Sequence, residues 1–381
     1  MSEYQPVLLT LPSLTPSLAL EILPHGLTLH RIIVQADGRT HDIVIGPESP
    51  KDHSTQKYTN SIIGRYTNRI PVGNYVLERN GVKCNFNALA NENPRVSLHG
   101  GPTGFDTASW TLLTPENPAT LFSEAELAHL SSPTAAHVIF RLVSPDGDQG
   151  YPGKLIVEAL VVLIGPGEQE RKYRLPDEAP RAASPEYDLG SIVLIYRAKL
   201  DEEGKQVVTP VNLTQAHDYY MFRSSEAQQI PTRIPLSSFD SKLDLIKDVL
   251  QPCNDAEGNP NRGNRPEPVV EISSDKSGIK LLFDTNQSGV MFYANGLANP
   301  SSGARKKIHG GSGISGHGDS YTPGTAAFLE FHDPLAAFLD SKNRDGNDTL
   351  ITTAELYHNY VRCDVRFKEV ADDPIESITE P

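Results

Sequence analysis

The sequence predicts an all-β fold, a large antiparallel β-sandwich, because strand-like apolar runs recur along the chain and long helical periodicity is nearly absent. The runs are rich in Val, Ile, Leu, Phe and Tyr, and clusters of Gly, Pro, Asn and Asp bound them. A content of 30 prolines and 29 glycines in 381 residues fits many turns between short strands. A chain of this length, 38% of it apolar, can form one large all-β domain or two ordinary domains.

The predicted elements follow one another along the chain. The strands cover residues 27–35, 41–46, 137–143, 154–164, 191–200, 278–284, 289–296 and 361–370. In the last of them, Val361, Cys363 and Val365 share one face, at the period of two expected of a strand. Short helices are predicted at 123–130 and 334–340. Three polar stretches are expected to be mobile surface loops, at 165–190, 252–268 and 299–324.

Charge and cysteine content restrict the function classes. A formal net charge of -14 disfavours binding to nucleic acids and to anionic membranes, because the surface would repel phosphate groups. The cysteines, Cys84, Cys253 and Cys363, are far apart and form no CxxC pair, so neither a disulfide framework nor a cysteine zinc site is indicated. Cysteine usage and an N-terminal stretch that prolines interrupt, without a basic apolar leader, favour a cytoplasmic protein.

Two polar clusters in the first third of the chain are candidates for a site. The segment SIIGRYTNRIPVGNYVL contains Arg65, Asn68 and Arg69 between apolar flanks. The segment VSLHGGPTGFDTASW contains His99 before two glycines, which let the backbone pass close to another surface. Taken singly, the arginines fit surface ion pairs and the histidine fits a loop.

Two further clusters lie in the C-terminal half. The segment NLTQAHDYY contains His217, which by itself is either a loop residue or a proton donor. The segment TAAFLEFHDPLAAF contains Glu330 at the end of an apolar run. A carboxylate in such a run is costly to bury unless it is paired or its pKa is raised, although it also fits the solvent face of a strand.

Taken together, these segments resemble the aldose 1-epimerase (galactose mutarotase) family. GRYTNRIPVGNY is similar to the family's glycine–arginine–x–x–asparagine–arginine–isoleucine signature, and SLHGGPTGFDTASW has its Leu-His-Gly-Gly, Gly-Phe-Asp and Trp at the family spacing. GYPGKLIVEALVVL, VNLT, GVMFYANG and AAFLEF follow in the family's order, so the likeness extends from about residue 18 to residue 370. It implies one domain over residues 1–381, with the galactose mutarotase-like supersandwich fold.

The resemblance also implies a reaction and its residues. Family members interconvert the α and β anomers of free aldoses such as glucose or galactose, without a metal or an organic cofactor. By position, Glu330 corresponds to the catalytic base and His217 to the acid that protonates the ring oxygen. Asn68, Arg69 and His99 correspond to residues that bind the sugar hydroxyls.

The chain departs from the family pattern at two positions. The family histidine stands two residues after the threonine of Asn-Leu-Thr, whereas His217 stands three after Thr214. An inserted residue that bulges the chain would let His217 still reach the ring oxygen. The family's hydroxyl-binding aspartate is best matched by Asp240, with Asp244 as a second candidate.

Other functions fit the same residues. An epimerase of hexose 6-phosphates would need basic residues, and Arg305, Lys306 and Lys307 form such a cluster. A non-catalytic sugar-binding or regulatory protein would keep the hydroxyl-binding residues and lose proton transfer at the displaced His217. The expected partner is a small free aldohexose, with neither nucleic acid nor membrane, and the expected state is a monomer or a weak dimer.

Overall fold

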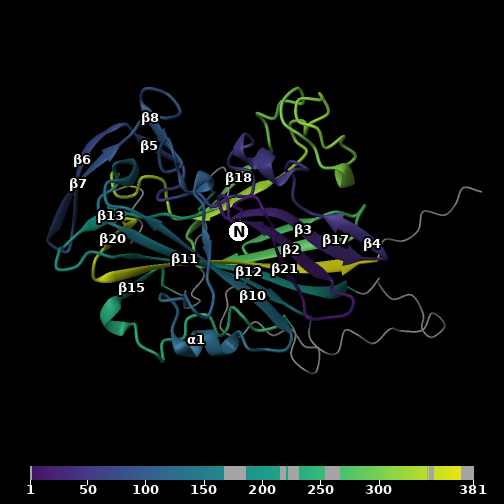
Figure 1. Cartoon of the computed structure of the whole chain (residues 1–381), viewed down its shortest axis with the longest axis horizontal. Coiled ribbons are helices and arrows are strands. Elements are labelled where there is room, and N and C mark those ends of the chain that lie inside the picture. Colours follow the sequence, from purple (N-terminus) through teal and green to yellow (C-terminus); the bar gives the residue numbers. More distant parts are fainter. Residues whose placement is uncertain are drawn as a thin grey trace, which may run out of the picture.

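The computed structural model describes residues 2–166, 186–214, 220–221, 231–253, 267–340, 342 and 347–369. Within this part of the chain, strands dominate and the sheets are antiparallel, which confirms the predicted fold class. Figure 1 shows the long strands of one large sheet crossing the molecule, with the N-terminal strands to one side and short hairpins above.

The large sheet has eight strands and contains most of the predicted segments. In spatial order they are β16 (Val270–Ser273), β17 (Ile279–Thr285), β21 (Glu355–Lys368), β12 (Glu186–Leu200), β11 (Leu155–Ile164), β10 (Ala135–Ser144) and β9 (Thr111–Leu112), with β15 (Arg233–Pro235) paired to β21. The β11 strand is apolar at almost every position because both of its faces are covered. Val157 and Val161 pack into the main core, whereas Leu160 and Val162 pack into a second core on the other face.

A four-stranded N-terminal sheet packs against the first face of the large sheet. Its strands are β1 (Val7–Thr10), β2 (Leu18–Leu23), β3 (Thr28–Ala36) and β4 (Arg39–Asp42). Leu20 and Val34 lie in the main core. The sequence prediction missed β1 and β2, because prolines interrupt this region, and it extended the β4 segment to residue 46. The strand ends at Asp42, whose carboxylate accepts the backbone N–H of Val44.

The short helix α1 (Glu124–His129) lies on the other face of the large sheet, below it in Figure 1. It confirms the predicted helix at 123–130. Ser123 and Glu126 form a capping box, which satisfies the first backbone N–H groups of the helix. Glu126 also forms an ion pair with Arg197 of β12 at 2.6 Å, and both side chains are fully buried. The helix is thereby fixed to the sheet.

Short sheets above the large sheet carry the candidate site. They consist of β5 (Arg69–Pro71) with β8 (Val96–Leu98), β6 (Gly73–Arg79) with β7 (Val82–Ala88), β13 (Val208–Pro210) with β20 (Leu350–Thr352), and β14 (Tyr220–Met221) with β18 (Gly289–Tyr293) and β19 (Phe328–His332). Five 3-10 turns also occur in the described residues, at Pro50–Ser54, Phe105–Thr107, Asp148–Gly150, Leu236–Ser238 and Lys307–His309.

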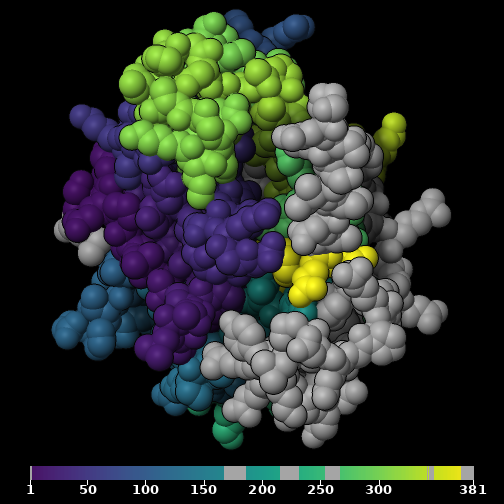
Figure 2. Space-filling view, turned by 90° about the vertical axis from the view of Figure 1, so that its right-hand side faces the viewer, coloured from purple at the N-terminus to yellow at the C-terminus, as the bar shows by residue number. Residues whose placement is uncertain are grey.

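The insertion at 299–324 differs from the mobile loop expected there. Lys306 is fully buried, and its ammonium group donates to the Asp42 carboxylate at 2.7 Å and to the carbonyls of His30 and Val44. Gln56 exchanges two hydrogen bonds with the backbone of Ala304. Figure 2 shows the yellow-green insertion packed above the purple N-terminal strands. Large parts of the other two polar stretches lie outside the described residues.

The helix predicted at 334–340 is wrong. The segment forms turns instead, and Ala336 has a φ of 47°, which no right-handed helix contains. In the described ranges, no helix is long and apolar enough to span a membrane.

We expect the free energy of unfolding to fall between pH 7 and pH 5 because of two buried imidazoles. Nδ1 of His30 lies 3.1 Å from Nε2 of His53. Burial and neighbouring positive charge lower the pKa of His30 to about 4 and that of His53 to about 3. Below about pH 6.5 the unfolded chain therefore binds protons that the folded chain does not, so acid favours unfolding. Each unit of pKa difference corresponds to about 1.4 kcal/mol.

Urea unfolding at the two pH values measures this loss. His53→Gln should make it smaller, whereas His317→Gln in the exposed part of the insertion should leave it unchanged. Equal losses in the wild type and in His53→Gln would contradict the assignment.

Candidate active site

Glu330 lies at the centre of the candidate site, on the β18–β19 hairpin. It pairs with Met291 of β18, and its side chain is fully buried. Its Oε2 accepts a hydrogen bond from the Thr67 hydroxyl at 3.2 Å and lies 3.6 Å from Nε2 of His332. Because side chains alternate along a strand, Glu330 and His332 share one face of β19, and Phe331 points to the other.

Asn68 connects this hairpin to the segment of His99. Its Nδ2 lies 2.7 Å from the sulfur of Met291, which is opposite Glu330 in the strand register. Its backbone N–H donates to Nδ1 of His99 at 3.2 Å, and the His99 N–H donates to the Asn68 carbonyl at 3.0 Å. Asn68 has a φ of 64°, a conformation that asparagine adopts more readily than most residues. The structure thus brings together Asn68, His99 and Glu330.

Neighbouring residues fix the tautomer of His99 and cover its imidazole ring. Nδ1 accepts a backbone N–H, so in the neutral ring the proton is on Nε2, which can donate to a hydroxyl group. The Tyr58 ring packs on the imidazole, with ring centroids 4.7 Å apart. Burial and the charge of Asp106 raise the pKa of Tyr58, so its hydroxyl is neutral. A side chain at Gly100 would place its Cβ 1.9 Å from the Gly64 carbonyl oxygen, which explains the glycine after His99.

The two arginines of the first cluster have different environments. Arg69 is half exposed, and its guanidinium forms a two-pronged ion pair with Glu92, with NH2 at 2.6 Å from Oε1. Its NH1 also lies 3.4 Å from the Asn68 side-chain oxygen, so it borders the site. Arg65 is buried and donates to Ser144 and to the carbonyls of Pro145 and Pro152, which makes it a structural residue.

His217 lies outside the described residues. The segment that leads to it is described as far as Thr214, which bridges to Ile63. Two residues earlier, Asn212 accepts the backbone N–H of Thr67 at 2.8 Å. Residues 212–214 therefore lie beside residues 63–67, which directly precede Asn68.

Asp240 and Asp244 are not brought to this cluster. The Asp240 carboxylate caps its own turn, accepting the N–H groups of Lys242 and Leu243. Asp244 lies 2.7 Å from the ring of His129 in α1. Both belong to the segment on the α1 face of the large sheet, whereas Glu330 and Asn68 lie on the opposite side.

Sequence reasoning missed four residues of the cluster, namely Tyr58, Thr67, Met291 and His332. Thr67 directly precedes Asn68 in the quoted signature, and His332 follows Glu330 by the two residues that place strand side chains on one face. These two could have been found from spacing. Tyr58 and Met291 carry no motif of their own. In the described ranges, no three His, Cys, Asp or Glu side chains are grouped closely enough to bind a metal ion.

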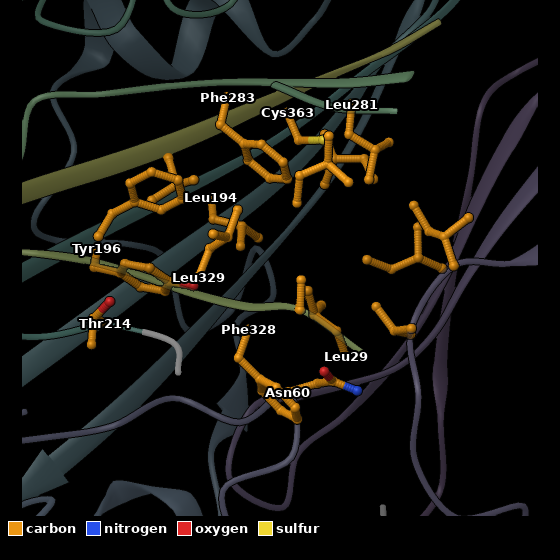
Figure 3. Close-up of a pocket in the computed structure, with 18 residues that line it drawn as sticks. Leu29, Asn60, Leu194, Tyr196, Thr214, Leu281, Phe283, Phe328, Leu329 and Cys363 are labelled. Carbon is orange, nitrogen blue, oxygen red and sulfur yellow. The ribbon is translucent and has the colours of Figure 1, made fainter. Parts of the chain in front are cut away.

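An apolar cavity of about 200 Å³ lies on the other face of β19. Figure 3 shows the side chains that point into it, among them Leu29, Leu194, Leu281, Phe283, Leu329 and Cys363. Asn60 and Thr214 supply the polar groups in its wall. Since Leu329 and Glu330 are adjacent strand residues, the cavity and the carboxylate lie on opposite faces. A lining this apolar leaves most sugar hydroxyls without hydrogen-bond partners, so the cavity is not the candidate sugar site.

The sequence is similar to known aldose 1-epimerases. The sequence model of the aldose 1-epimerase family matches residues 13–178. Galactose mutarotase of Bos taurus is 31% identical over 240 residues, which cover 62% of this chain and 52% of that protein. Aldose 1-epimerase of Escherichia coli (strain K12) is 26% identical over 279 residues, covering 72% of this chain and 62% of that protein. The chain thus spans about half the length of the bovine relative that it matches.

Two solved structures share the fold. The aldose epimerase homologue from C. elegans superimposes with a TM-score of 0.55 at 16% identity, covering 93% of this chain and 97% of that one. Galactose 1-epimerase from Lactobacillus acidophilus superimposes with a TM-score of 0.53 at 17% identity, covering 93% and 92%. Residues 13–178 thus match the aldose 1-epimerase family in sequence, and the chain shares the fold of these two structures over nearly its whole length.

Proposed function

We propose that the chain is an aldose 1-epimerase, an isomerase that interconverts the α and β anomers of a free hexose such as glucose or galactose. The observation that carries the proposal is the fully buried Glu330 carboxylate, which accepts a hydrogen bond from Thr67, while the next residue, Asn68, contacts both Met291 opposite Glu330 and His99. A buried carboxylate beside hydrogen-bonding groups is suited to proton transfer near neutral pH.

The proposed reaction needs one base and one acid. Glu330 takes the proton of the C1 hydroxyl while the bond between C1 and the ring oxygen breaks. His217 gives a proton to the ring oxygen, which leaves an open-chain aldehyde. Rotation about the C1–C2 bond presents the other face of the aldehyde. Reclosure returns the proton from Glu330 to the new C1 hydroxyl and the ring-oxygen proton to His217, so the enzyme is regenerated.

Asn68, His99 and Arg69 are the proposed contacts to the sugar hydroxyls. The side chains of Asn68 and His99 are at most 1% exposed, so a sugar reaches them only when covering side chains move aside. Tyr58 is such a cover, because its ring lies against His99. Arg69 is preoriented by Glu92 at the edge of this group.

The basic cluster of the insertion counts against a phosphorylated substrate. The Lys306 ammonium is buried and held by Asp42. The Arg305 guanidinium lies over the Tyr321 ring at 5.6 Å. A phosphate would have to compete with these partners, so a free hexose fits the described residues better.

Optical rotation of fresh α-D-glucose and α-D-galactose tests the proposal. The wild type should speed the decay to equilibrium, and His217→Ala should lower kcat at least about 100-fold, because a general acid contributes about that much or more. His317→Ala, on the exposed part of the insertion, is the matched control and should behave as the wild type.

Other results of these sugar experiments would each point to a different acid or a different function. An active His217→Ala variant would show that another group protonates the ring oxygen. A wild type that binds sugar without exchanging anomers would identify a non-catalytic sugar-binding protein. Activity restricted to hexose 6-phosphates would identify the phosphorylated-substrate enzyme instead.

A further inference from the structure

We infer that His332 is a positioning residue that sets the proton affinity of Glu330 through a neutral imidazole nitrogen aimed at the carboxylate. The inference rests on the proposed function, in which Glu330 is the base. His332 and Glu330 are two residues apart on β19 and project from the same face. Both side chains are fully buried, and Nε2 lies 3.6 Å from Oε2 of Glu330.

The other ring nitrogen fixes the tautomer of His332. Nδ1 lies 2.6 Å from the backbone carbonyl oxygen of Asp333. A carbonyl oxygen can only accept a hydrogen bond, so Nδ1 carries the proton. In the neutral ring, Nε2 then presents a lone pair to the carboxylate of Glu330.

This arrangement favours one proton between the two groups. A carboxylate oxygen and a bare imidazole nitrogen are both acceptors, and they repel each other away from water. A proton on Glu330 removes the repulsion, because Oε2–H can then donate to Nε2 once the two atoms move closer than their present 3.6 Å. The proton that Glu330 takes from the C1 hydroxyl therefore has a prepared acceptor, and it returns to the sugar at reclosure. Thr67 donates to the same oxygen at 3.2 Å and orients it.

Other titratable groups lie around Asp333, the residue that follows His332. Burial raises the pKa of Asp333, while the Ser288 hydroxyl and the charge of Arg233 from β15 act in the opposite direction. Burial and the charge of Asp333 raise the pKa of Tyr357 from β21. From the Asn68 side, His99 accepts a hydrogen bond through Nδ1 and is neutral in that tautomer. The ring nitrogen to which the inference assigns the effect on Glu330 is Nε2 of His332, at 3.6 Å from the carboxylate.

The pH profile of kcat for anomer exchange tests the inference in a His332→Gln variant. The Gln amide can donate an N–H to the carboxylate where the wild type presents a lone pair, so the Glu330 pKa should fall. We expect the acidic limb of the profile to move down by about one pH unit and kcat at pH 7 to fall about 10-fold, with KM within about two-fold, since a weaker base transfers protons less well. His317→Gln is the matched control. A His332→Gln profile that coincides with an active wild type would overturn the inference and leave the proposed function intact.

Nitrogen NMR of the histidine rings gives a readout that does not depend on catalytic activity. In the wild type at pH 7, His332 should be the neutral Nδ1–H tautomer, and Glu330→Gln should lower its pKa because the carboxylate is lost. An Nε2–H tautomer or an imidazolium at pH 7 would overturn the inference. If the wild type exchanges no sugar, the proposed function fails, and the NMR result alone decides whether the two side chains share a proton.

Discussion

Glu330→Gln is expected to lower kcat for anomer exchange by about 1,000-fold and to change sugar affinity by no more than a few-fold. The amide has the shape of the carboxylate but cannot take the C1 hydroxyl proton, and general base catalysis contributes about 100-fold to 10,000-fold. The Thr67 hydroxyl can still donate to the amide oxygen, so the hairpin should remain in place. Polarimetry measures exchange, and titration calorimetry with galactose measures binding.

A matched control separates this result from a general effect of removing a carboxylate. Glu271 lies on the edge strand β16 with its side chain about half exposed, and Glu271→Gln should retain wild-type exchange. Full activity in Glu330→Gln would exclude Glu330 as the base. Loss of both binding and exchange would instead indicate that the carboxylate holds the site together.

The large sheet could be predicted from sequence because its strands are apolar at nearly every position. The predicted segment 154–164 agrees with β11 to within one residue at each end, whereas 191–200 ends with β12 but begins five residues after its first residue. The strands β1 and β2 were missed for the opposite reason. Pro12 and Pro16 interrupt the N-terminal pattern, yet they lie between the two strands and never inside either ladder.

The candidate site was predictable only in part. Motif order identified Asn68, His99 and Glu330, which the structure brings together. Spacing along the chain does not say which face of a sheet a segment covers, and the Asp240 segment covers the α1 face. Packing partners such as Tyr58 come from loops without a periodic pattern, so three-dimensional contact alone reveals them.

The packing of the insertion at 299–324 could likewise not be predicted from the local sequence. Its glycines and serines are typical of a mobile loop, and local composition predicts one. What holds it are long-range contacts, among them the buried ion pair between Lys306 and Asp42, which are separated by 264 positions. A charged residue in a polar stretch is normally solvated, and nothing near Lys306 in the sequence indicates that its ammonium group is buried.

Lys306→Met is expected to destabilise the folded protein by about 3 kcal/mol. Removing the ammonium group leaves the buried Asp42 carboxylate without its shortest ionic contact, and breaking a buried pair from one side costs about 3–5 kcal/mol. Arg31 still contacts Asp42 at 3.3 Å, which places the expected cost at the lower end of that range. Urea unfolding measures the loss, and hydrogen exchange across residues 299–324 should show faster exchange there than in β11.

Two further variants make this result specific to the buried pair. Lys307→Met removes the neighbouring exposed charge and should change stability by no more than about 0.5 kcal/mol, as surface substitutions usually do. Adding Asp42→Asn to Lys306→Met should recover part of the loss, because the uncompensated carboxylate is then gone. If Lys306→Met were as stable as Lys307→Met, the hydrogen bonds of Gln56 to Ala304 and of Tyr321 to the backbone of Gly46 would hold the insertion without the lysine.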